Sequence, residues 1–166
     1  MKYPQLSLRE TNAPYMEEMK TAAAEVIEGG WYIRGKYVSR LEEQLCAYLG
    51  CRYAVATGNG LDALRLMLRA YIEMGVMQPG DEVIVPEPCF VCYAPLIEMM
   101  GGIAVPLYTK AEDKFKVTPE LLAPLLTPRT KMLVLSYPNN PTGAIMTRED
   151  LKKVLPLLQA HDLLVL

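Results

Sequence analysis

The chain has 166 residues, of which 51% are apolar and 22% charged, and 17 basic against 19 acidic residues give a net charge of −2. This composition excludes a disordered polyelectrolyte, and so small a charge gives no electrostatic support for binding nucleic acid or an anionic membrane. No apolar run is long enough to cross a bilayer, and the N-terminus has no signal-peptide pattern. We therefore expect a globular, cytoplasmic protein.

The first third of the chain is expected to be helical after an irregular arm at residues 1–14. Helices are predicted over residues 15–28 and 38–49, because each apolar periodic stretch ends at a glycine. The loop between them contains Ile33 and Gly35. We assign this region to an N-terminal segment of arm and helices.

From residue 50 onward, short β-rich runs alternate with helical stretches. Strands are predicted at residues 52–56, 82–85, 103–107, 131–135 and 163–166. Helices are predicted at residues 61–74, 90–100, from Thr118 onward, and at 151–160 after a near capping box at 147–150. This alternation predicts a three-layer α/β/α fold with a mainly parallel sheet. The expected division is residues 1–49 and 50–166.

Four cysteines and one histidine restrict the chemistry further. Cys89 and Cys92 form a C-x-x-C pair, which with Cys46 and Cys51 admits a redox or a zinc interpretation. The loose spacing of Cys46 and Cys51 favours buried or half-buried thiols in a reducing compartment instead. His161 is the only histidine and lies in a loop, so we expect neither a metal site nor a nucleophilic hydrolase.

Two of three candidate segments follow the first and second predicted strands. Gly58 and Gly60 flank a turn into a helix whose first N–H groups suit a phosphate, although a plain strand-to-helix turn explains them equally well. Phe90 follows the next strand, at the edge where α/β sheets bind ligands. It either stacks on a planar ring there or packs in the core.

The third segment, residues 137–143, follows the most apolar strand and places two asparagines between prolines. The Tyr137–Pro138 and Asn140–Pro141 bonds are candidates for cis geometry. A plain turn would not require a buried strand to lead into it. We therefore favour a binding site in this loop.

In this order, the three segments resemble the PLP-dependent aminotransferases of fold type I. Similarity to the class I/II amino-acid aminotransferases is carried by residues 80–86, 87–93, 137–143 and 147–151. Similarity to the sugar aminotransferase (DegT) family is carried by residues 30–35, 41–43 and 58–64. The DegT family usually has Thr where Leu61 stands and lacks the Asn-Asn-Pro-Thr-Gly loop. The chain is interpreted as a natural or constructed hybrid, with an unusual single lineage as the alternative.

The resemblance implies roles for the matching residues. The backbone N–H groups of Gly60, Leu61 and Asp62 would hold the phosphate of pyridoxal 5′-phosphate (PLP). Phe90 would stack on the pyridine ring, and Asn140 would hydrogen-bond its phenolic oxygen.

Substrate contacts are implied as well. Ile33 and Gly35 would lie near the substrate carboxylate, together with Asn140, whereas Asn139 receives no role. The expected substrates are an amino acid and a keto acid, and the family implies a homodimer.

The residues that complete transamination are missing from the sequence. The resemblance requires a lysine that forms the Schiff base and an acidic partner for the pyridine nitrogen. No lysine lies in a matching motif, so covalent attachment of PLP is not expected. We interpret the chain as an N-terminal portion of a longer enzyme, with an incomplete large domain and no activity alone.

The fold should be affected in the same way. In the family's sheet, residues 52–56 pair with strands that this sequence lacks. We predict a four-stranded parallel sheet from the other strands, with residues 52–56 displaced, re-paired or on an unsupported edge. Two other interpretations stay open: an active keto-sugar nucleotide aminotransferase if the sequence is part of a longer enzyme, and a non-catalytic fragment or engineered chimera.

Overall fold

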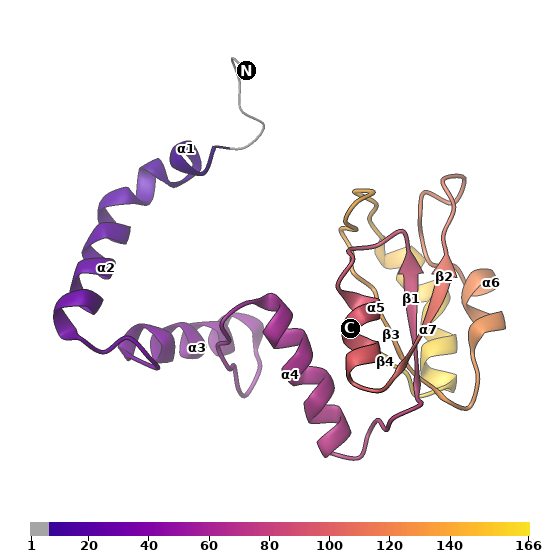
Figure 1. The fold of residues 1–166 in the computed structure, drawn as a ribbon. Coiled ribbons are helices and arrows are strands. Elements are labelled where there is room, and N and C mark those ends of the chain that lie inside the picture. Colours follow the sequence, from indigo (N-terminus) through magenta and orange to yellow (C-terminus); the bar gives the residue numbers. More distant parts are fainter. Residues whose placement is uncertain (1–6) are drawn as a thin grey trace. The chain divides into compact units, whose positions relative to one another are not determined.

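The computed structural model describes residues 7–166, and the chain divides into two compact units, Met1–Ala56 and Thr57–Leu166 (Figure 1). The predicted arm falls in part on residues 1–6, which lie outside the described residues.

The N-terminal unit is helical. Its elements are α1 (Leu8–Asn12), the 3₁₀ turn η1 (Ala13–Tyr15), α2 (Met16–Gly29) and α3 (Lys36–Leu49). The two longer helices confirm the predicted ones and end at Gly30 and Gly50, both in the left-handed conformation that glycine adopts without strain. The predicted irregular arm is wrong for residues 8–14, which are helical. Ser7 caps α1 by accepting a hydrogen bond from the N–H of Glu10 at 3.3 Å.

The strand predicted at residues 52–56 is wrong. These residues form no ladder with any described strand. The N–H of Ala56 instead donates to the Glu42 carboxylate at 2.8 Å, and the side chains of Tyr53 and Val55 are exposed. A single extended segment without a partner strand leaves its backbone groups to water and side chains. The expected displacement of this segment from the sheet agrees with the structure.

The C-terminal unit is a four-stranded parallel sheet with helices packed on it (Figure 1). Its strands are β1 (Glu82–Glu87), β2 (Ile103–Tyr108), β3 (Thr130–Leu133) and β4 (Leu164–Val165), in the order β2-β1-β3-β4. Its helices are α4 (Gly60–Glu73), α5 (Tyr93–Met99), α6 (Pro119–Leu122) with the turn η2 (Ala123–Leu125), and α7 (Arg148–Ala160). This confirms the predicted α/β fold and its four-stranded sheet.

Two hydrophobic clusters cover the two faces of β1. Side chains alternate across a strand, so Val83 and Val85 face one cluster and Ile84 faces the other. The first cluster includes Leu68 of α4 and Leu96 and Ile97 of α5. The second includes Leu122 of α6 and Val154 and Leu158 of α7. The sheet is therefore the middle layer of three.

Two predicted helix N-caps, at α7 and at α6, can be compared with the structure. Thr147 and Asp150 form the expected capping box at the start of α7. Asp150 also accepts a hydrogen bond from Lys116 at 2.6 Å, and this contact is the main cause that lowers the pKa of its carboxyl. Thr118 stands at the N-cap of α6 as predicted, but its side chain makes no capping bond.

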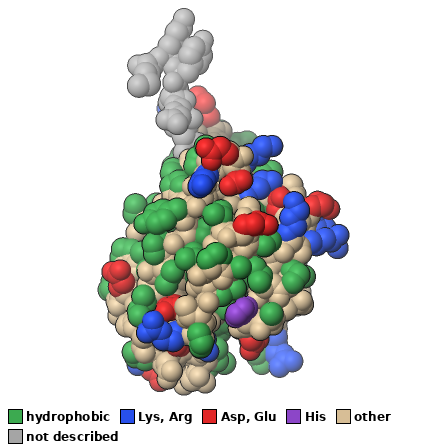
Figure 2. Space-filling model, turned by 90° about the vertical axis from the view of Figure 1, so that its right-hand side faces the viewer, with side chains coloured by type: hydrophobic (Ala, Val, Ile, Leu, Met, Phe, Trp, Pro, Cys, Tyr) green, Lys and Arg blue, Asp and Glu red, His purple; other side chains and the backbone are tan. Residues whose placement is uncertain are grey.

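The surface carries both charges. On the face in Figure 2, hydrophobic side chains lie among basic and acidic ones, and the single histidine, His161, is exposed there. Among residues 7–166, no helix combines the length and the apolar character needed to cross a membrane.

A buried carboxylate holds the start of β1 against the loop before β3. Glu82 is 5% exposed and accepts hydrogen bonds from Thr127 at 2.6 Å, Thr130 at 3.2 Å and the Arg129 guanidinium at 2.7 Å. The pKa of Glu82 is lowered chiefly by the Thr127 hydroxyl, with the charge of Arg129 acting in the same direction. The ionised form therefore stabilises the fold.

We predict that Glu82→Gln lowers the free energy of unfolding by about 1–3 kcal/mol at neutral pH, because charge-assisted hydrogen bonds are lost. The pKa of Glu82 in the folded state lies below its ordinary value of 4.5. Its stabilisation is therefore complete above that value and is lost as the pH falls through the folded-state pKa. Urea unfolding across a pH series should show the difference between wild type and variant shrinking in acid.

The control is Glu112→Gln, which removes an exposed carboxylate. It should change the unfolding free energy little at any pH. A wild-type-minus-Glu82→Gln difference that is the same in neutral and acid solution would contradict the role given to Glu82.

Candidate active site

The first wall of the candidate site is the N-terminus of α4. Asn59 is its N-cap: its side-chain oxygen accepts the N–H of Asp62 at 2.9 Å, and its amide nitrogen donates to the Asp62 carboxylate at 2.9 Å. Among the described residues, the N–H groups of Gly60 and Leu61 have no acceptor. The helix start thus offers two free donors, while the third predicted donor, Asp62, is already engaged.

The direction of α4 follows from its connection to β1. Leu68 belongs to the same buried cluster as Val83 and Val85, and a short connection leads from the end of α4 into β1. The helix therefore runs opposite to β1, so that its N-terminus is the end remote from this connection (Figure 1).

The second wall follows the carboxyl end of β1. Phe90 is 48% exposed, so its ring is not a core side chain. Between β1 and Phe90 stand Pro88, whose peptide bond to Glu87 is cis, and Cys89. The exposed ring leaves an aromatic face for a planar ligand.

The third wall is the loop at residues 137–143, which follows β3. Both peptide bonds predicted as cis candidates, Tyr137–Pro138 and Asn140–Pro141, are cis. The loop closes on itself through the Gly143 N–H, which donates to the Asn139 carbonyl at 2.7 Å, with Gly143 at φ 70°. Asn140 is exposed and Asn139 is buried.

A hydrogen bond joins the second and third walls directly. The side-chain nitrogen of Asn139 donates to the Pro88 carbonyl oxygen at 3.2 Å. The bond is possible because β1 and β3 are parallel neighbours, with the Val134 N–H donating to the Ile84 carbonyl at 2.9 Å. The structure thus brings the segments carrying Phe90 and Asn140 together, through a residue to which the sequence assigned no role.

The loop is also held from its other end. The Tyr137 hydroxyl donates to the Phe115 carbonyl at 2.8 Å. Burial raises the pKa of Tyr137, so the hydroxyl stays protonated and able to donate. Lys114 and Phe115 both have φ 54°, which marks a tight turn before this contact.

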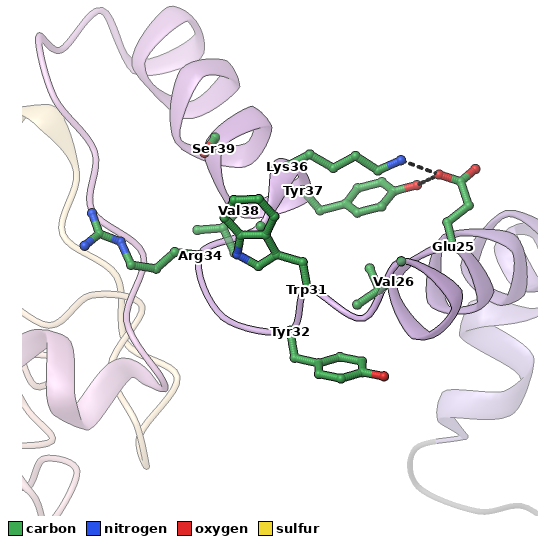
Figure 3. Close-up of a pocket in the computed structure, with 11 residues that line it drawn as sticks. Glu25, Val26, Trp31, Tyr32, Arg34, Lys36, Tyr37, Val38 and Ser39 are labelled. Carbon is green, nitrogen blue, oxygen red and sulfur yellow. Dashed lines mark hydrogen bonds and ion pairs between the residues drawn. The ribbon is translucent and has the colours of Figure 1, made fainter.

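Two of the three predicted substrate-side residues, Ile33 and Gly35, lie in the N-terminal unit, which contains a cavity of about 580 Å³ (Figure 3). Gly35 lines this cavity, and a Cβ there would come within 2.9 Å of the Trp31 carbonyl oxygen, so only glycine fits. Ile33 is exposed, and its carbonyl accepts a hydrogen bond from the Trp31 indole at 2.7 Å.

A hydrogen-bonded charge pair stands at the rim of the same cavity. The Glu25 carboxylate accepts a hydrogen bond from Lys36 at 2.8 Å and another from the Tyr37 hydroxyl at 2.6 Å. Figure 3 shows both side chains reaching the carboxylate. The hydrogen bond that Lys36 donates to Glu25 lowers the pKa of Glu25 and raises the pKa of Lys36. The pair is exposed and keeps both charges at neutral pH.

The C-x-x-C pair has the character of half-buried thiols. Burial, together with the charge of Glu87, raises the pKa of Cys89 to about 11, and burial raises the pKa of Cys92. Protonated thiols are poor nucleophiles and poor metal ligands. Within residues 7–166, no three His, Cys, Asp or Glu side chains gather as a metal site would require.

Comparison with known proteins adds the family. The profile of the DegT/DnrJ/EryC1/StrS aminotransferase family matches residues 15–166. The chain is 32% identical over 165 residues to dTDP-3-amino-3,6-dideoxy-alpha-D-galactopyranose transaminase of Aneurinibacillus thermoaerophilus, covering 95% of this chain and 44% of that protein. It is 41% identical over 92 residues to aspartate aminotransferase of Musicola paradisiaca, covering 55% and 23%.

The fold agrees with this assignment. DesV of S. venezuelae, solved in complex with a ketimine intermediate, superposes with a TM-score of 0.78 at 30% identity, over 98% of this chain and 41% of that one. The chain thus spans less than half the length of each of these relatives. The match over nearly its whole length and the shared fold show that the chain belongs to the DegT/DnrJ/EryC1/StrS aminotransferase family.

Proposed function

We propose that this chain supplies the phosphate- and ring-binding walls of a PLP-dependent aminotransferase, which moves an amino group between an amino acid and a keto acid. The observation that carries the proposal is the Asn139–Pro88 hydrogen bond. It holds an exposed aromatic ring and an exposed amide on adjacent loops at the carboxyl edge of a parallel sheet.

The residues present fit the cofactor's chemistry. Two free N–H groups at a helix start suit a phosphate dianion, a half-exposed Phe ring suits a pyridine face, and an exposed amide suits a phenolic oxygen. Gly60 and Leu61 would hold the phosphate, Phe90 would stack on the ring, and Asn140 would hydrogen-bond the ring oxygen. Asp62 would contribute its N–H only by giving up its bond from Asn59. When bound, PLP supplies the electron sink for reaction at the substrate carbon.

Covalent attachment of the cofactor and proton transfer both need a lysine, and we find no lysine in this chain that suits the role. Lys116 is paired with Asp150, and Lys152 and Lys153 lie exposed on α7. Lys110 and Lys114 lie exposed in the loop after β2. We therefore propose that the 166-residue chain does not transaminate by itself and binds PLP only non-covalently.

Residues 1–49 would act on the substrate side and in association, and residues 50–166 on the cofactor. Ile33 and Gly35 would lie near the substrate carboxylate, with Asn140 contributing from the cofactor side. None of the helices α1, α2 and α3 buries a side chain, so this surface is available for a second copy. We therefore propose a homodimer. We place it in the cytoplasm, because all four thiols are unpaired, as is usual in a reducing compartment.

A keto-sugar substrate is the second candidate. It is favoured by the match of the sugar-aminotransferase family profile over residues 15–166. The Asn-Asn-Pro-Thr-Gly loop, in which the sequence resembles amino-acid aminotransferases, favours an amino-acid substrate instead. We propose a hybrid origin for this combination.

The cofactor assignment predicts that the chain binds PLP and that Asn140→Ala weakens this binding about ten- to hundredfold, because a hydrogen bond to a charged oxygen is lost. Phe90→Ala should weaken it by a similar or smaller factor. Equilibrium dialysis with PLP measures both. Asn12→Ala, at the C-terminal end of α1 and outside the candidate site, is the control and should bind like wild type. Equal affinity of wild type, Asn140→Ala and Phe90→Ala would contradict the assignment.

The missing lysine predicts that borohydride treatment with PLP leaves no stoichiometric lysine adduct and that no amino group is transferred between amino and keto acids. Peptide mass mapping after reduction measures the first and a coupled assay the second. A single fully labelled lysine, or turnover above the rate of free PLP, would overturn the inactive-chain proposal.

The exposed N-terminal unit predicts self-association, measurable by analytical ultracentrifugation. Tyr48→Glu places a charge on the most exposed aromatic side chain of α3 and should weaken association. Gln44→Glu adds the same charge at an exposed polar position of that helix and should not. A wild type that stays monomeric at high concentration would contradict the dimer.

A further inference from the structure

We propose that Asn139 is a positioning residue, which pins the loop at residues 137–143 to Pro88 and so fixes the spacing between Phe90 and Asn140. That this spacing serves cofactor binding rests on the proposed function. That Asn139 fixes the spacing rests on the hydrogen bonds of Asn139.

Every hydrogen-bonding group of Asn139 is used. Its side-chain oxygen accepts the Thr142 N–H at 3.2 Å and the Thr142 hydroxyl at 2.8 Å, and its side-chain nitrogen donates to Pro88 at 3.2 Å. Its own N–H donates to the Ala144 carbonyl at 2.8 Å, and its carbonyl accepts from Gly143 at 2.7 Å. At 6% exposure these bonds are shielded from water, where a lost partner is costly.

The position calls for an amide. One end must accept two hydrogen bonds and the other must donate to a carbonyl, and only Asn and Gln side chains do both. Aspartate would place a carboxylate oxygen against the Pro88 carbonyl oxygen. An apolar residue of the same size would leave the Pro88 and Thr142 groups without their partner.

The neighbouring asparagine has the opposite character. Asn140 is exposed and free to face a ligand, whereas Asn139 points into the protein. Asn139 directly precedes Asn140, and Pro88 lies two residues before Phe90. A bond between Asn139 and Pro88 therefore constrains both ligand-facing side chains through very short stretches of backbone.

Phe90 does not hold its own loop in place. Its ring is half exposed, so it contributes little burial to fix residues 88–90. On the other side, the Tyr137 hydroxyl anchors the start of the asparagine loop to Phe115 at 2.8 Å. The bond from Asn139 is thus the link that carries this anchored position across to the Phe90 segment.

The test compares Asn139→Asp with Thr142→Val in the 166-residue chain. Asn139→Asp keeps the acceptor for Thr142 and, measured at a pH where its carboxyl is ionised, removes the donor to Pro88. Thr142→Val removes the hydroxyl contact on the other side and keeps that donor. The carbonyl carbon of Pro88 and the amide nitrogen of Cys89 belong to one peptide group, so their chemical shifts report this hydrogen bond without any cofactor.

We expect both shifts to move in Asn139→Asp and to stay near wild type in Thr142→Val. PLP affinity by equilibrium dialysis should fall about three- to tenfold in Asn139→Asp and less in Thr142→Val. Unchanged Pro88 and Cys89 shifts in a folded Asn139→Asp variant would overturn the proposal.

If Asn139→Asp does not fold, a measurement on the wild type tests the proposal instead. The side-chain amide protons of Asn139 should exchange with solvent more slowly than those of Asn140, and equal exchange would overturn the proposal. Failure of the wild type to bind PLP would contradict the proposed function alone, since both NMR readouts are independent of PLP.

Discussion

The pairing of β1 with a parallel strand on each side is the constraint on which the rest of the C-terminal unit depends. β2 and β3 bond to its two edges, and Val83, Ile84 and Val85 are buried completely. Because these side chains alternate, one strand supplies the centre of both hydrophobic clusters. Removing β1 would leave α4 and α5 on one face, and α6 and α7 on the other, without a common layer.

The same pairing creates the candidate site. Neighbouring parallel strands end at one edge, so the loops after β1 and β3 must meet there. Short, rigid loops turn this proximity into contact, because Asn139 reaches the Pro88 carbonyl and Tyr137 reaches Phe115. The helix start at Gly60 and Leu61 belongs to the same unit and offers free N–H groups. The contact between the second and third walls of the candidate site is therefore a consequence of strand order.

Elements with strong local signals were predictable from sequence. The capping box at Thr147 and Asp150 predicted the start of α7, and the β-rich runs at residues 82–85, 103–107 and 131–135 predicted the sheet. The predicted irregular arm was wrong at residues 8–14, where Pro14 lies in the first positions of the turn η1, which tolerate proline. The β-rich pattern at residues 52–56 wrongly predicted a strand, because β-propensity does not say whether a partner strand is available; the family resemblance correctly predicted that these residues would not join the sheet.

The site was predictable in type but not in detail. Asn139 and Asn140 are adjacent and chemically identical, so only their opposite burial separates a positioning residue from a ligand-facing one. The engagement of Asp62 by Asn59 likewise depends on the cap geometry. Whether Phe90 packs in the core depends on which helices cover the end of β1, which is a tertiary property.

We propose that the cofactor binds across the N-terminus of α4 and the loops after β1 and β3. An NMR titration of the 166-residue chain with PLP can locate the binding surface, because each backbone amide reports its own surroundings. We expect the largest amide shifts at Gly60 and Leu61, at Phe90 and at Asn140. Shifts confined to other surfaces, such as the cavity beside Trp31, would contradict this proposal.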